Sequence, residues 1–231
     1  MLLRRDQTDR DRLAFAFADQ VAADLGAAMA TRGAASLAVS GGSTPAKFFS
    51  ALAAHDEIDW KRVVVTLVDE RWVDEGSGRS NAALVRAHLL QGPAAAARFV
   101  PLYSGGEMPA ADRIAETNRR LSVLPETLDV VVLGMGNDGH TASFFPGGDT
   151  LETALSDPGP ALALAAPGAG EPRVTLTLPR LLMAVSLYVH IEGAEKLATL
   201  ERALGDGSIA DMPIRAVLRQ TETPVTVYWC P

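Results

Sequence analysis

A histidine follows a group of glycines near the middle of the chain. After the apolar run Leu128–Leu133 the sequence reads Gly-Met-Gly-Asn-Asp-Gly-His-Thr-Ala-Ser, which places Asp138 two residues before His140. A neutral imidazole titrates at about pH 6.5, so a histidine exposed at a strand end is suited to general acid–base catalysis. His140 and Asp138 are therefore candidate catalytic residues. The alternative is a histidine that is only hydrogen-bonded within its own turn.

The same glycines form the pattern GxGxxG, which is typical of dinucleotide-binding loops. Three features argue against a dinucleotide here. Asp138 would lie where a pyrophosphate approaches, and Pro146 with a glycine pair interrupts any long helix after the loop. The strand is also in the middle of the chain, whereas the fingerprint belongs to a first βαβ unit. We therefore interpret the segment as a loop that exposes Asp138 and His140.

A second glycine-rich turn follows the apolar run Ser36–Ser40 and reads Gly-Gly-Ser-Thr-Pro. Paired glycines allow a ligand to approach the backbone, and the serine or threonine can cap a helix whose first position suits the proline. Free amides at a helix start can bind phosphate. It is not a Walker loop, because no Gly-Lys-Ser/Thr follows. The alternative is an ordinary glycine-rich turn with a capped helix. The candidate anion-binding residues are Gly41, Gly42, Ser43 and Thr44.

Three basic residues lie near the ends of expected strands, where open α/β sheets bind ligands. Arg71 follows an apolar run in the sequence Asp-Glu-Arg-Trp-Val, for which a solvated turn is the alternative. Lys196 falls in the first turn of an expected helix, where a cation opposes the helix dipole. That unfavourable position favours a role for Lys196 in anion binding, and Arg173 is a weaker candidate of the same kind.

Metal and thiol chemistry have little support in the sequence. Cys230 is the single cysteine, so the chain has neither an intramolecular disulfide nor a cysteine metal cluster. The other histidines (His55, His88 and His190) show no HxH or HxxxH spacing, and we expect them to be structural or surface residues. We predict no metal and no cofactor.

The elements that position these residues alternate along the chain. Apolar, β-branched runs predict strands at Ser36–Ser40, Val63–Val68, Leu128–Leu133, Ser186–Ile191 and Val225–Trp229. Helical spacing predicts helices at Asp11–Ala30, Pro45–Ala54, Asn81–Leu90, Ala110–Leu121 and Ala194–Leu204. Strands that are apolar at nearly every position indicate a mainly parallel sheet covered on both faces. The alternation predicts an open α/β sandwich formed by residues 1–231 as a single domain.

Two segments depart from this pattern. Val174–Leu178 alternates between apolar residues and threonine, which favours a half-exposed strand, antiparallel at an edge. Asp157–Glu171 contains three prolines and three glycines, and we interpret it as a surface excursion.

Composition limits the classes of function. The chain has 231 residues, of which 48% are apolar, and 21 basic against 28 acidic residues give a net charge of −7. A general nucleic-acid binder would be basic, so any anion site must be local. The N-terminus lacks the apolar core of a signal peptide, and Leu181–Ile191 falls short of the about 20 residues that span a bilayer. We predict a soluble, cytoplasmic protein.

Taken together, the motifs resemble the 6-phosphogluconolactonase family. They are SGGSTP, DERWV with a following SN, LGMGNDGHTASFFPG, RVTLT and EGAEK, which occur in family order from about residue 35 to residue 229. The related glucosamine-6-phosphate deaminases follow DGH with an Asn-Glu-Pro element and carry a tyrosine in the second loop. Phe144-Phe145-Pro146-Gly147 lacks that glutamate, so the lactonases fit better.

The resemblance implies a three-layer α/β/α domain, a mainly parallel sheet of modified Rossmann type, and hydrolysis of 6-phospho-D-glucono-1,5-lactone without a cofactor. It implies that His140 is the general base and that Asp138 either orients it or shapes the loop. It also implies a phosphate site. The residues implied to hold the phosphate are Gly42, Ser43, Thr44, Arg71 and Lys196, with Arg173 near the substrate.

Two other functions remain as alternatives. One is a deaminase or isomerase of amino-sugar phosphates, and the other is a non-catalytic sugar-phosphate-binding module, which would not need His140. We expect a phosphorylated sugar lactone as the partner, no nucleic acid and no membrane, and a monomer or small homo-oligomer.

Overall fold

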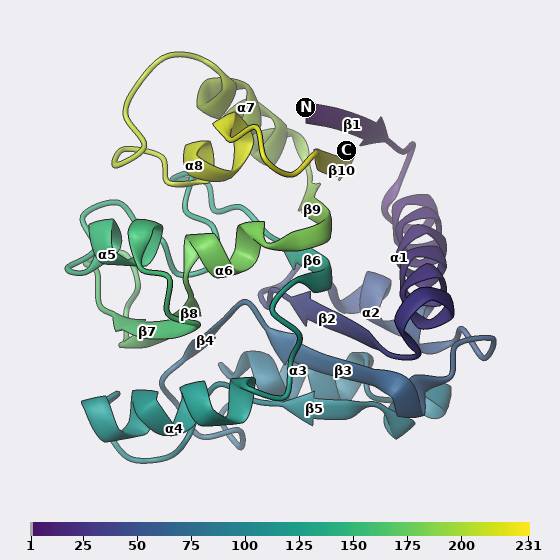
Figure 1. Cartoon of the computed structure of the whole chain (residues 1–231). Helices are drawn as coiled ribbons and strands as arrows, with labels where there is room; N and C mark the ends of the chain where they lie inside the picture. Colours follow the sequence, from purple (N-terminus) through teal and green to yellow (C-terminus); the bar gives the residue numbers. More distant parts are fainter. Residues whose placement is uncertain (1) are drawn as a thin grey trace.

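The computed structural model describes residues 2–231 and contains one seven-stranded sheet in which every neighbouring pair of strands is parallel (Figure 1). The strand order is β1-β10-β9-β6-β2-β3-β5. The strands are β1 (Leu2–Asp6), β2 (Ala35–Val39), β3 (Val63–Leu67), β5 (Arg98–Val100), β6 (Leu128–Leu133), β9 (Ala184–Glu192) and β10 (Val225–Cys230). Every residue of β2 and β6 is buried, which is the reason why their sequences are apolar at all but one position each.

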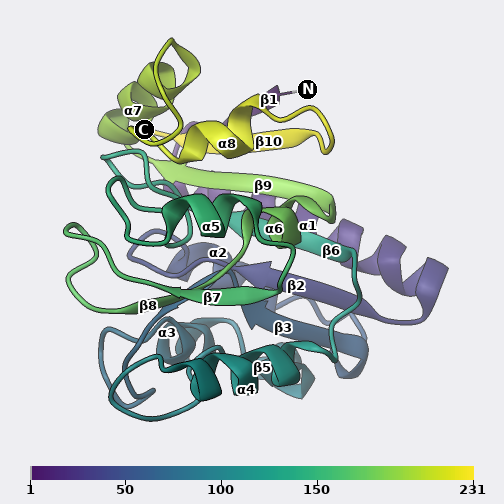
Figure 2. The same ribbon diagram turned by 60° about the vertical axis from the view of Figure 1, so that its left-hand side comes forward.

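Helices cover both faces of this sheet, so the fold is the three-layer α/β/α arrangement that the motifs implied. In Figure 2, α1 and α2 lie behind the sheet, and α5, α6 and α8 lie in front of it. The α-helices are α1 (Arg10–Arg32), α2 (Ala46–Ala53), α3 (Asn81–His88), α4 (Ala111–Leu121), α5 (Leu151–Ser156), α6 (Leu178–Leu182), α7 (Ala194–Leu204) and α8 (Ile214–Arg219), with 3-10 turns η1 (Trp60–Arg62) and η2 (Gly92–Ala96). The five predicted strands and five predicted helices are confirmed, with ends within two residues of those expected.

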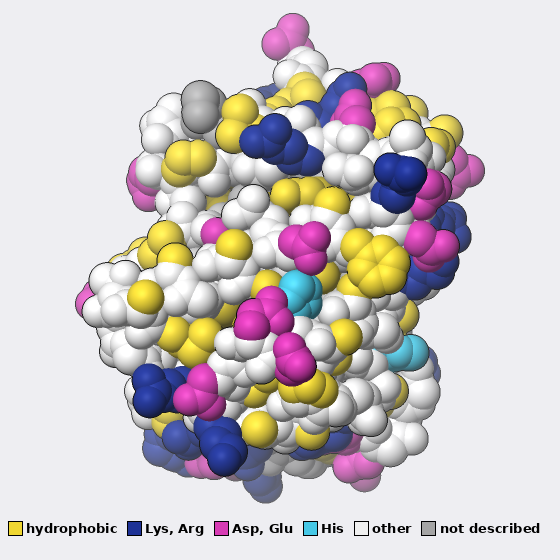
Figure 3. Space-filling model, turned by 90° about the vertical axis from the view of Figure 1, so that its right-hand side faces the viewer, with side chains coloured by type: hydrophobic (Ala, Val, Ile, Leu, Met, Phe, Trp, Pro, Cys, Tyr) yellow, Lys and Arg dark blue, Asp and Glu magenta, His cyan; other side chains and the backbone are white. Residues whose placement is uncertain are grey.

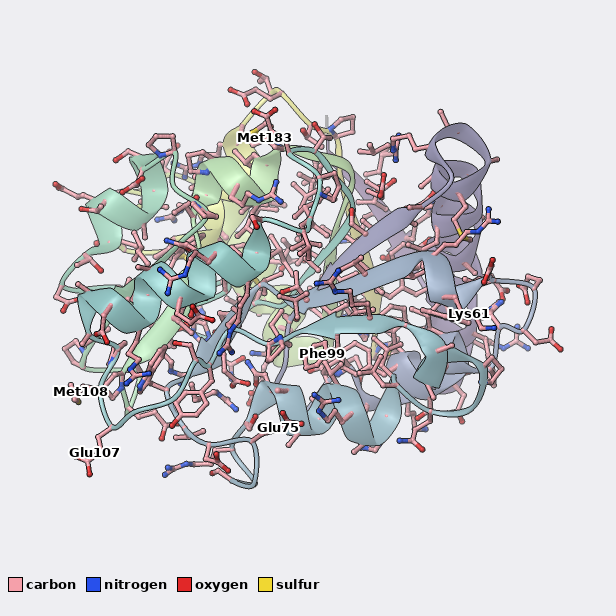
Figure 4. The ribbon with its side chains drawn as sticks, turned by 60° about the horizontal axis from the view of Figure 1, so that its bottom comes forward. Lys61, Glu75, Phe99, Glu107, Met108 and Met183 are labelled. Carbon is pink, nitrogen blue, oxygen red and sulfur yellow. The ribbon has the colours of Figure 1, made fainter. Side chains whose placement is uncertain are left out.

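The edge strands β1 and β5 were missed because neither has the sequence of a buried strand. Four of the five β1 residues are exposed, and β5 has only three residues. β1 pairs with β10, which places the two ends of the chain side by side (Figure 1). At the opposite edge the guanidinium of Arg86 lies 5.1 Å from the ring centre of Phe99 on β5 (Figure 4).

A second, three-stranded antiparallel sheet lies beside the main one in the described part of the chain. Its order is β4 (Asp69–Arg71), β8 (Arg173–Leu176) and β7 (Ala161–Leu164). Three interpretations of the sequence are corrected here. The acidic-basic segment with Arg71 is a strand, not a turn; the excursion at residues 157–171 contains β7; and the alternating segment is the buried central strand, not a half-exposed edge.

The error over β8 has a clear cause. The alternating pattern predicted that its threonines face solvent, but Thr175 and the following Thr177 are both fully buried. Each hydroxyl donates to a main-chain carbonyl, Thr175 to Leu176 at 3.0 Å and Thr177 to Gly159 at 2.7 Å. A hydroxyl whose hydrogen bond is made inside the fold can be buried at little cost, so alternation alone does not indicate exposure.

Helix α1 is the largest contributor to the core behind the sheet. Leu13, Phe17, Val21 and Leu25 repeat every four residues and are fully buried, and Gly33 ends the helix in the left-handed region at φ 76°. Among residues 2–231, α1 is the one helix long and apolar enough to cross a membrane, with a mean hydropathy of 1.3. Of that apolar window, 44% is buried inside the protein.

Candidate active site

The carboxyl ends of β2, β6 and β9 surround a cavity of about 270 Å³. All the predicted site residues except Asp138 line this cavity, although they come from five separate segments of the chain. Asp138 is hydrogen-bonded to His140, which does line it. The cavity residues predicted from the sequence are Gly41, Gly42, Ser43, Thr44, Arg71, His140, Arg173 and Lys196.

His140 is oriented by Asp138. The Nδ1 atom of His140 is 2.6 Å from Oδ1 of Asp138, and the same oxygen accepts from the backbone N–H of His140 at 3.1 Å. Burial raises the pKa of Asp138, but the two hydrogen bonds from His140 outweigh it and bring the pKa to about 2. Because an ionised carboxylate can only accept, Nδ1 carries the ring proton and the lone pair is on Nε2. Nε2 is therefore the ring atom that can accept a proton, and 31% of the side chain is exposed.

Gly136 makes this arrangement sterically feasible. A Cβ atom at residue 136 would lie 2.1 Å from His140 Nδ1 and 2.5 Å from Asp138 Oδ1. Any side chain there would displace the paired groups, so the glycine spacing of this loop serves the histidine and carboxylate, not a pyrophosphate.

The loop Gly41–Thr44 joins β2 to α2 and lines the cavity. Contrary to expectation, neither Ser43 nor Thr44 caps α2: the N-cap is Pro45, and in the described part of the chain no side chain accepts a hydrogen bond at this cap. The reason is that the helix begins one residue later than the prediction, which moves both hydroxyls out of capping position.

Asn81 and Glu70 hold the neighbouring loops, and the sequence analysis assigned a role to neither. The Asn81 amide donates to the carbonyl of Asp69 at 2.9 Å, and a Cβ on Gly41 would lie 2.0 Å from its Oδ1. Gly41 is therefore required for close packing of the two loops. The Ser-Asn pair after the second strand was the available signal for Asn81.

Glu70 is a fully buried carboxylate on β4 that organises the main chain around Arg71. It accepts from the backbone N–H groups of Arg71 at 2.8 Å and of Asn81 and Ala82 at 2.7 Å each. Burial raises its pKa, and these N–H groups act in the opposite direction. The Arg71 side chain donates from Nη1 to the carbonyl of Arg79 at 2.6 Å.

Lys196 and Arg173 bring positive charge to the same cavity. Lys196, in the first turn of α7, donates from Nζ to the carbonyl of Met135 at 2.7 Å. Burial lowers the pKa of Lys196, and the Asp138 carboxylate offsets only part of that shift. Arg173 is 8% exposed and donates from Nη2 to the carbonyl of Ala169 at 2.7 Å.

Further residues on the cavity were not predicted as site residues. Asp69 accepts from the Ser143 hydroxyl at 2.6 Å and lies 4.0 Å from Arg173 Nη1. His190, expected to be structural or at the surface, is 4% exposed and also lines the cavity. Within residues 2–231 no group of three or more His, Cys, Asp or Glu side chains is placed to hold a metal ion.

Comparison with known proteins gives a consistent result. A family model described as glucosamine-6-phosphate isomerases/6-phosphogluconolactonase matches residues 8–229. The 6-phosphogluconolactonase of Rhizobium meliloti is 53% identical over 221 residues, covering 95% of this chain and 94% of its own length. That of Pseudomonas aeruginosa is 45% identical over 219 residues, covering 93% of this chain and 89% of its own.

Solved structures of similar proteins indicate the same family. The crystal structure of a 6-phosphogluconolactonase from Shewanella baltica superposes with a TM-score of 0.97 at 41% identity, covering 100% of this chain and 98% of its own. A monomeric glucosamine-6-phosphate deaminase has a TM-score of 0.74 at 15% identity, which shows a common fold alone. On these matches, which span nearly its whole length, the chain belongs to the glucosamine-6-phosphate isomerase/6-phosphogluconolactonase family.

Proposed function

We propose that the protein hydrolyses 6-phospho-D-glucono-1,5-lactone to 6-phospho-D-gluconate, the second step of the oxidative pentose phosphate pathway. The observation that carries the proposal is the His140–Asp138 pair, at 2.6 Å, whose histidine lines the same cavity as the loop Gly41–Thr44 and three cationic side chains. The relatives named 6-phosphogluconolactonase, at up to 53% identity, support the same activity.

His140 acts as the general base. Its Nε2 atom takes a proton from water while the water oxygen attacks C1 of the lactone, and the carbonyl electrons move to the oxygen to give a tetrahedral oxyanion. When the oxyanion collapses, the C1–ring oxygen bond breaks and the imidazolium returns its proton to the departing ring oxygen. The ionised Asp138 stabilises the imidazolium between these steps. General acid–base catalysis of this kind contributes about 10²–10⁴-fold.

The phosphate site orients the lactone against His140. The backbone amides and hydroxyls of Gly41–Thr44, the Arg71 guanidinium and the Lys196 ammonium bind the phosphate oxygens, and Arg173 lies near the sugar. Arg71 can bind two oxygens at once, whereas Lys196 acts as a point charge. The phosphate lies far from C1, and binding it increases the rate of hydrolysis because it fixes the orientation of the lactone. A δ-lactone carbonyl is already electrophilic, so the reaction requires no cofactor.

We propose further that residues 1–231 act as one cytoplasmic domain, as a monomer or small homo-oligomer, without nucleic-acid or membrane partners. The net charge of −7 supports this for nucleic acid. On the face that carries α1, basic side chains lie beside acidic ones instead of forming a continuous basic surface (Figure 3).

The deciding experiment is hydrolysis of freshly generated 6-phosphogluconolactone, with spontaneous hydrolysis subtracted. We expect an enzyme-dependent rate that is lost in His140→Ala. The rival activity in the family, deamination of glucosamine 6-phosphate, is measured in parallel as ammonia release. Ammonia release without lactone hydrolysis would contradict the proposal and favour the deaminase reaction, whereas binding of sugar phosphate without turnover would favour a non-catalytic module.

A further inference from the structure

Phe145 lies on the cavity beside His140, and the sequence analysis gave it no role. It lies five residues after His140, at the end of the loop at residues 134–145 that follows β6 (the histidine loop). Its side chain lines the cavity and is 4% exposed. Its position is that of a core residue with one side on the cavity.

The first contact of Phe145 is with the general base. The Phe145 and His140 rings are stacked, with centroids 4.2 Å apart and an angle of 27° between the planes. The hydrogen bond to Asp138 restrains Nδ1 but leaves the imidazole able to tilt about that bond. A flat aromatic surface against the ring removes the tilt, so two contacts together determine where Nε2 points.

The second contact of Phe145 is with the arginine. The guanidinium carbon of Arg173 lies 5.4 Å from the centroid of the same ring, within the range of a cation–π contact. Arg173 otherwise donates from Nη2 to the carbonyl of Ala169, and its Nε atom is buried with no hydrogen-bond partner among residues 2–231. The Phe145 ring therefore helps to hold the Arg173 guanidinium in place.

We propose that Phe145 is a positioning residue whose single ring fixes the general base His140 and the substrate-facing Arg173 relative to each other. The inference rests on the proposed function, because the proposed function makes His140 the general base and places Arg173 beside the lactone. Its chemical consequence is that the distance between the water-activating nitrogen and the sugar is set by one side chain that has no polar group of its own.

Phe144 provides a matched control. It is the adjacent residue and of the same type, and it is fully buried. The aromatic contacts with His140 and Arg173 in the described part of the chain are made by Phe145, not by Phe144. Replacing either residue by leucine removes the same amount of ring, so a loss of packing alone would affect the two variants alike.

The activity test compares Phe145→Leu, Phe145→Tyr and Phe144→Leu with the wild type, after thermal unfolding shows that each variant is folded. We expect kcat to fall roughly tenfold in Phe145→Leu, since small displacements of catalytic groups cost this much or more. Phe145→Tyr, which keeps the ring, restores most of that loss, and Phe144→Leu lowers Tm with kcat nearly unchanged. In a double-mutant cycle the effects of Phe145→Leu and Arg173→Lys on kcat/KM are less than additive.

A second readout separates this proposal from the proposed function. The imidazole proton signals of His140, assigned by their loss in His140→Ala, are shifted by the ring current of Phe145. Phe145→Leu removes that shift and Phe144→Leu leaves it, whether or not the lactone is the substrate. Wild-type kcat and KM in Phe145→Leu, equal losses in both leucine variants, or an unchanged His140 signal would each overturn the positioning role. Absence of lactone hydrolysis in the wild type would instead overturn the proposed function.

Discussion

Two loops at the carboxyl edge of the same sheet are built in opposite ways. In the loop after β6 the histidine itself is oriented by bonds within the loop: Gly136 N–H donates to the His140 carbonyl at 2.8 Å, and Asp138 accepts from both the ring and the backbone of His140. Residues of α7 and α8 bond to other main-chain groups of the loop, as Lys196 does to the Met135 carbonyl. The loop after β2 is supported from outside, by the Asn81 amide packed against Gly41. The Ser43 and Thr44 hydroxyls of this loop do not cap α2.

Under the proposed function, the difference follows from the role of each loop. A general base needs its tautomer and direction fixed before the substrate arrives, because reorientation during the reaction would add to the barrier. An anion-binding loop needs donors that are not already used, because the anion itself completes their hydrogen bonds. Changes in the β6 loop should therefore act on kcat, and changes at the anion site should act mainly on KM.

The largest effect is expected at the base. His140→Ala should lower kcat by about 10²–10⁴-fold with little change in KM, since the variant keeps the phosphate site. The rise in wild-type kcat from acid to neutral pH should disappear with it. Steady-state kinetics on fresh lactone provide the measurement, with His88→Ala, outside the cavity, as the control. Near wild-type kcat in His140→Ala would remove the histidine from the mechanism.

Removing only the charge of the orienting carboxylate should have a smaller effect on the same parameter. Asp138→Asn keeps the size of the side chain but cannot stabilise the imidazolium, so kcat should fall about tenfold or more. If Asp138 only shapes the loop, kcat is unchanged and the variant differs in stability alone. The kcat–KM split therefore decides between the two roles that the sequence left open.

The same variant has a distinct dependence on pH. The folded pKa of Asp138, about 2, lies below its ordinary value of 3.8, so the ionised form stabilises the fold. This contribution is fully present above pH 3.8 and is lost as the pH falls through about 2. In urea unfolding, the stability difference between wild type and Asp138→Asn should shrink over that interval. A difference that grows towards acid pH would contradict the assignment.

At the anion site, Lys196→Ala should raise KM roughly ten- to a hundred-fold, the value of a charge-assisted hydrogen bond. The net charge of −7 does not attract a dianion, so this local charge is needed. The variant should also discriminate less between phosphorylated and unphosphorylated gluconolactone. Lys47→Ala, whose exposed ammonium pairs with Asp11, is the matched control. Unchanged phosphate selectivity in Lys196→Ala would show that the phosphate binds elsewhere.

These sites differ in how far sequence could predict them. The His140 loop and the Lys196 helix start were identifiable because glycine spacing and helix position are local properties. The roles of Glu70, Asn81 and Phe145 depend on contacts between segments far apart in the chain, such as the Glu70 carboxylate with the first turn of α3. A sequence pattern does not show which loops meet, so these supporting residues were missed.

The fold shows the same limit. Strands buried on both faces were predicted from their apolar runs, whereas the small sheet was not, because its polar residues find partners inside the protein. Asp69 is the clearest case: it lies on β4 with 6% exposure, and its carboxylate accepts from Ser143 on the histidine loop at 2.6 Å. Such residues have the sequence character of surface turns.

The smallest effect is expected from metal removal. Exhaustive treatment with a chelator should leave kcat and KM unchanged, because Asp69 on the cavity and Asp138 behind His140 already have partners. Asp69 accepts from Ser143 and faces Arg173 at 4.0 Å, and Asp138 holds His140 at 2.6 Å. A metal ion would have to displace these groups, and so it would remove the orientation of the base. Activity that disappears with chelator and returns with one added metal would reverse this reasoning, and it would identify Asp69 and Asp138 as ligands instead of as supports for Arg173 and His140.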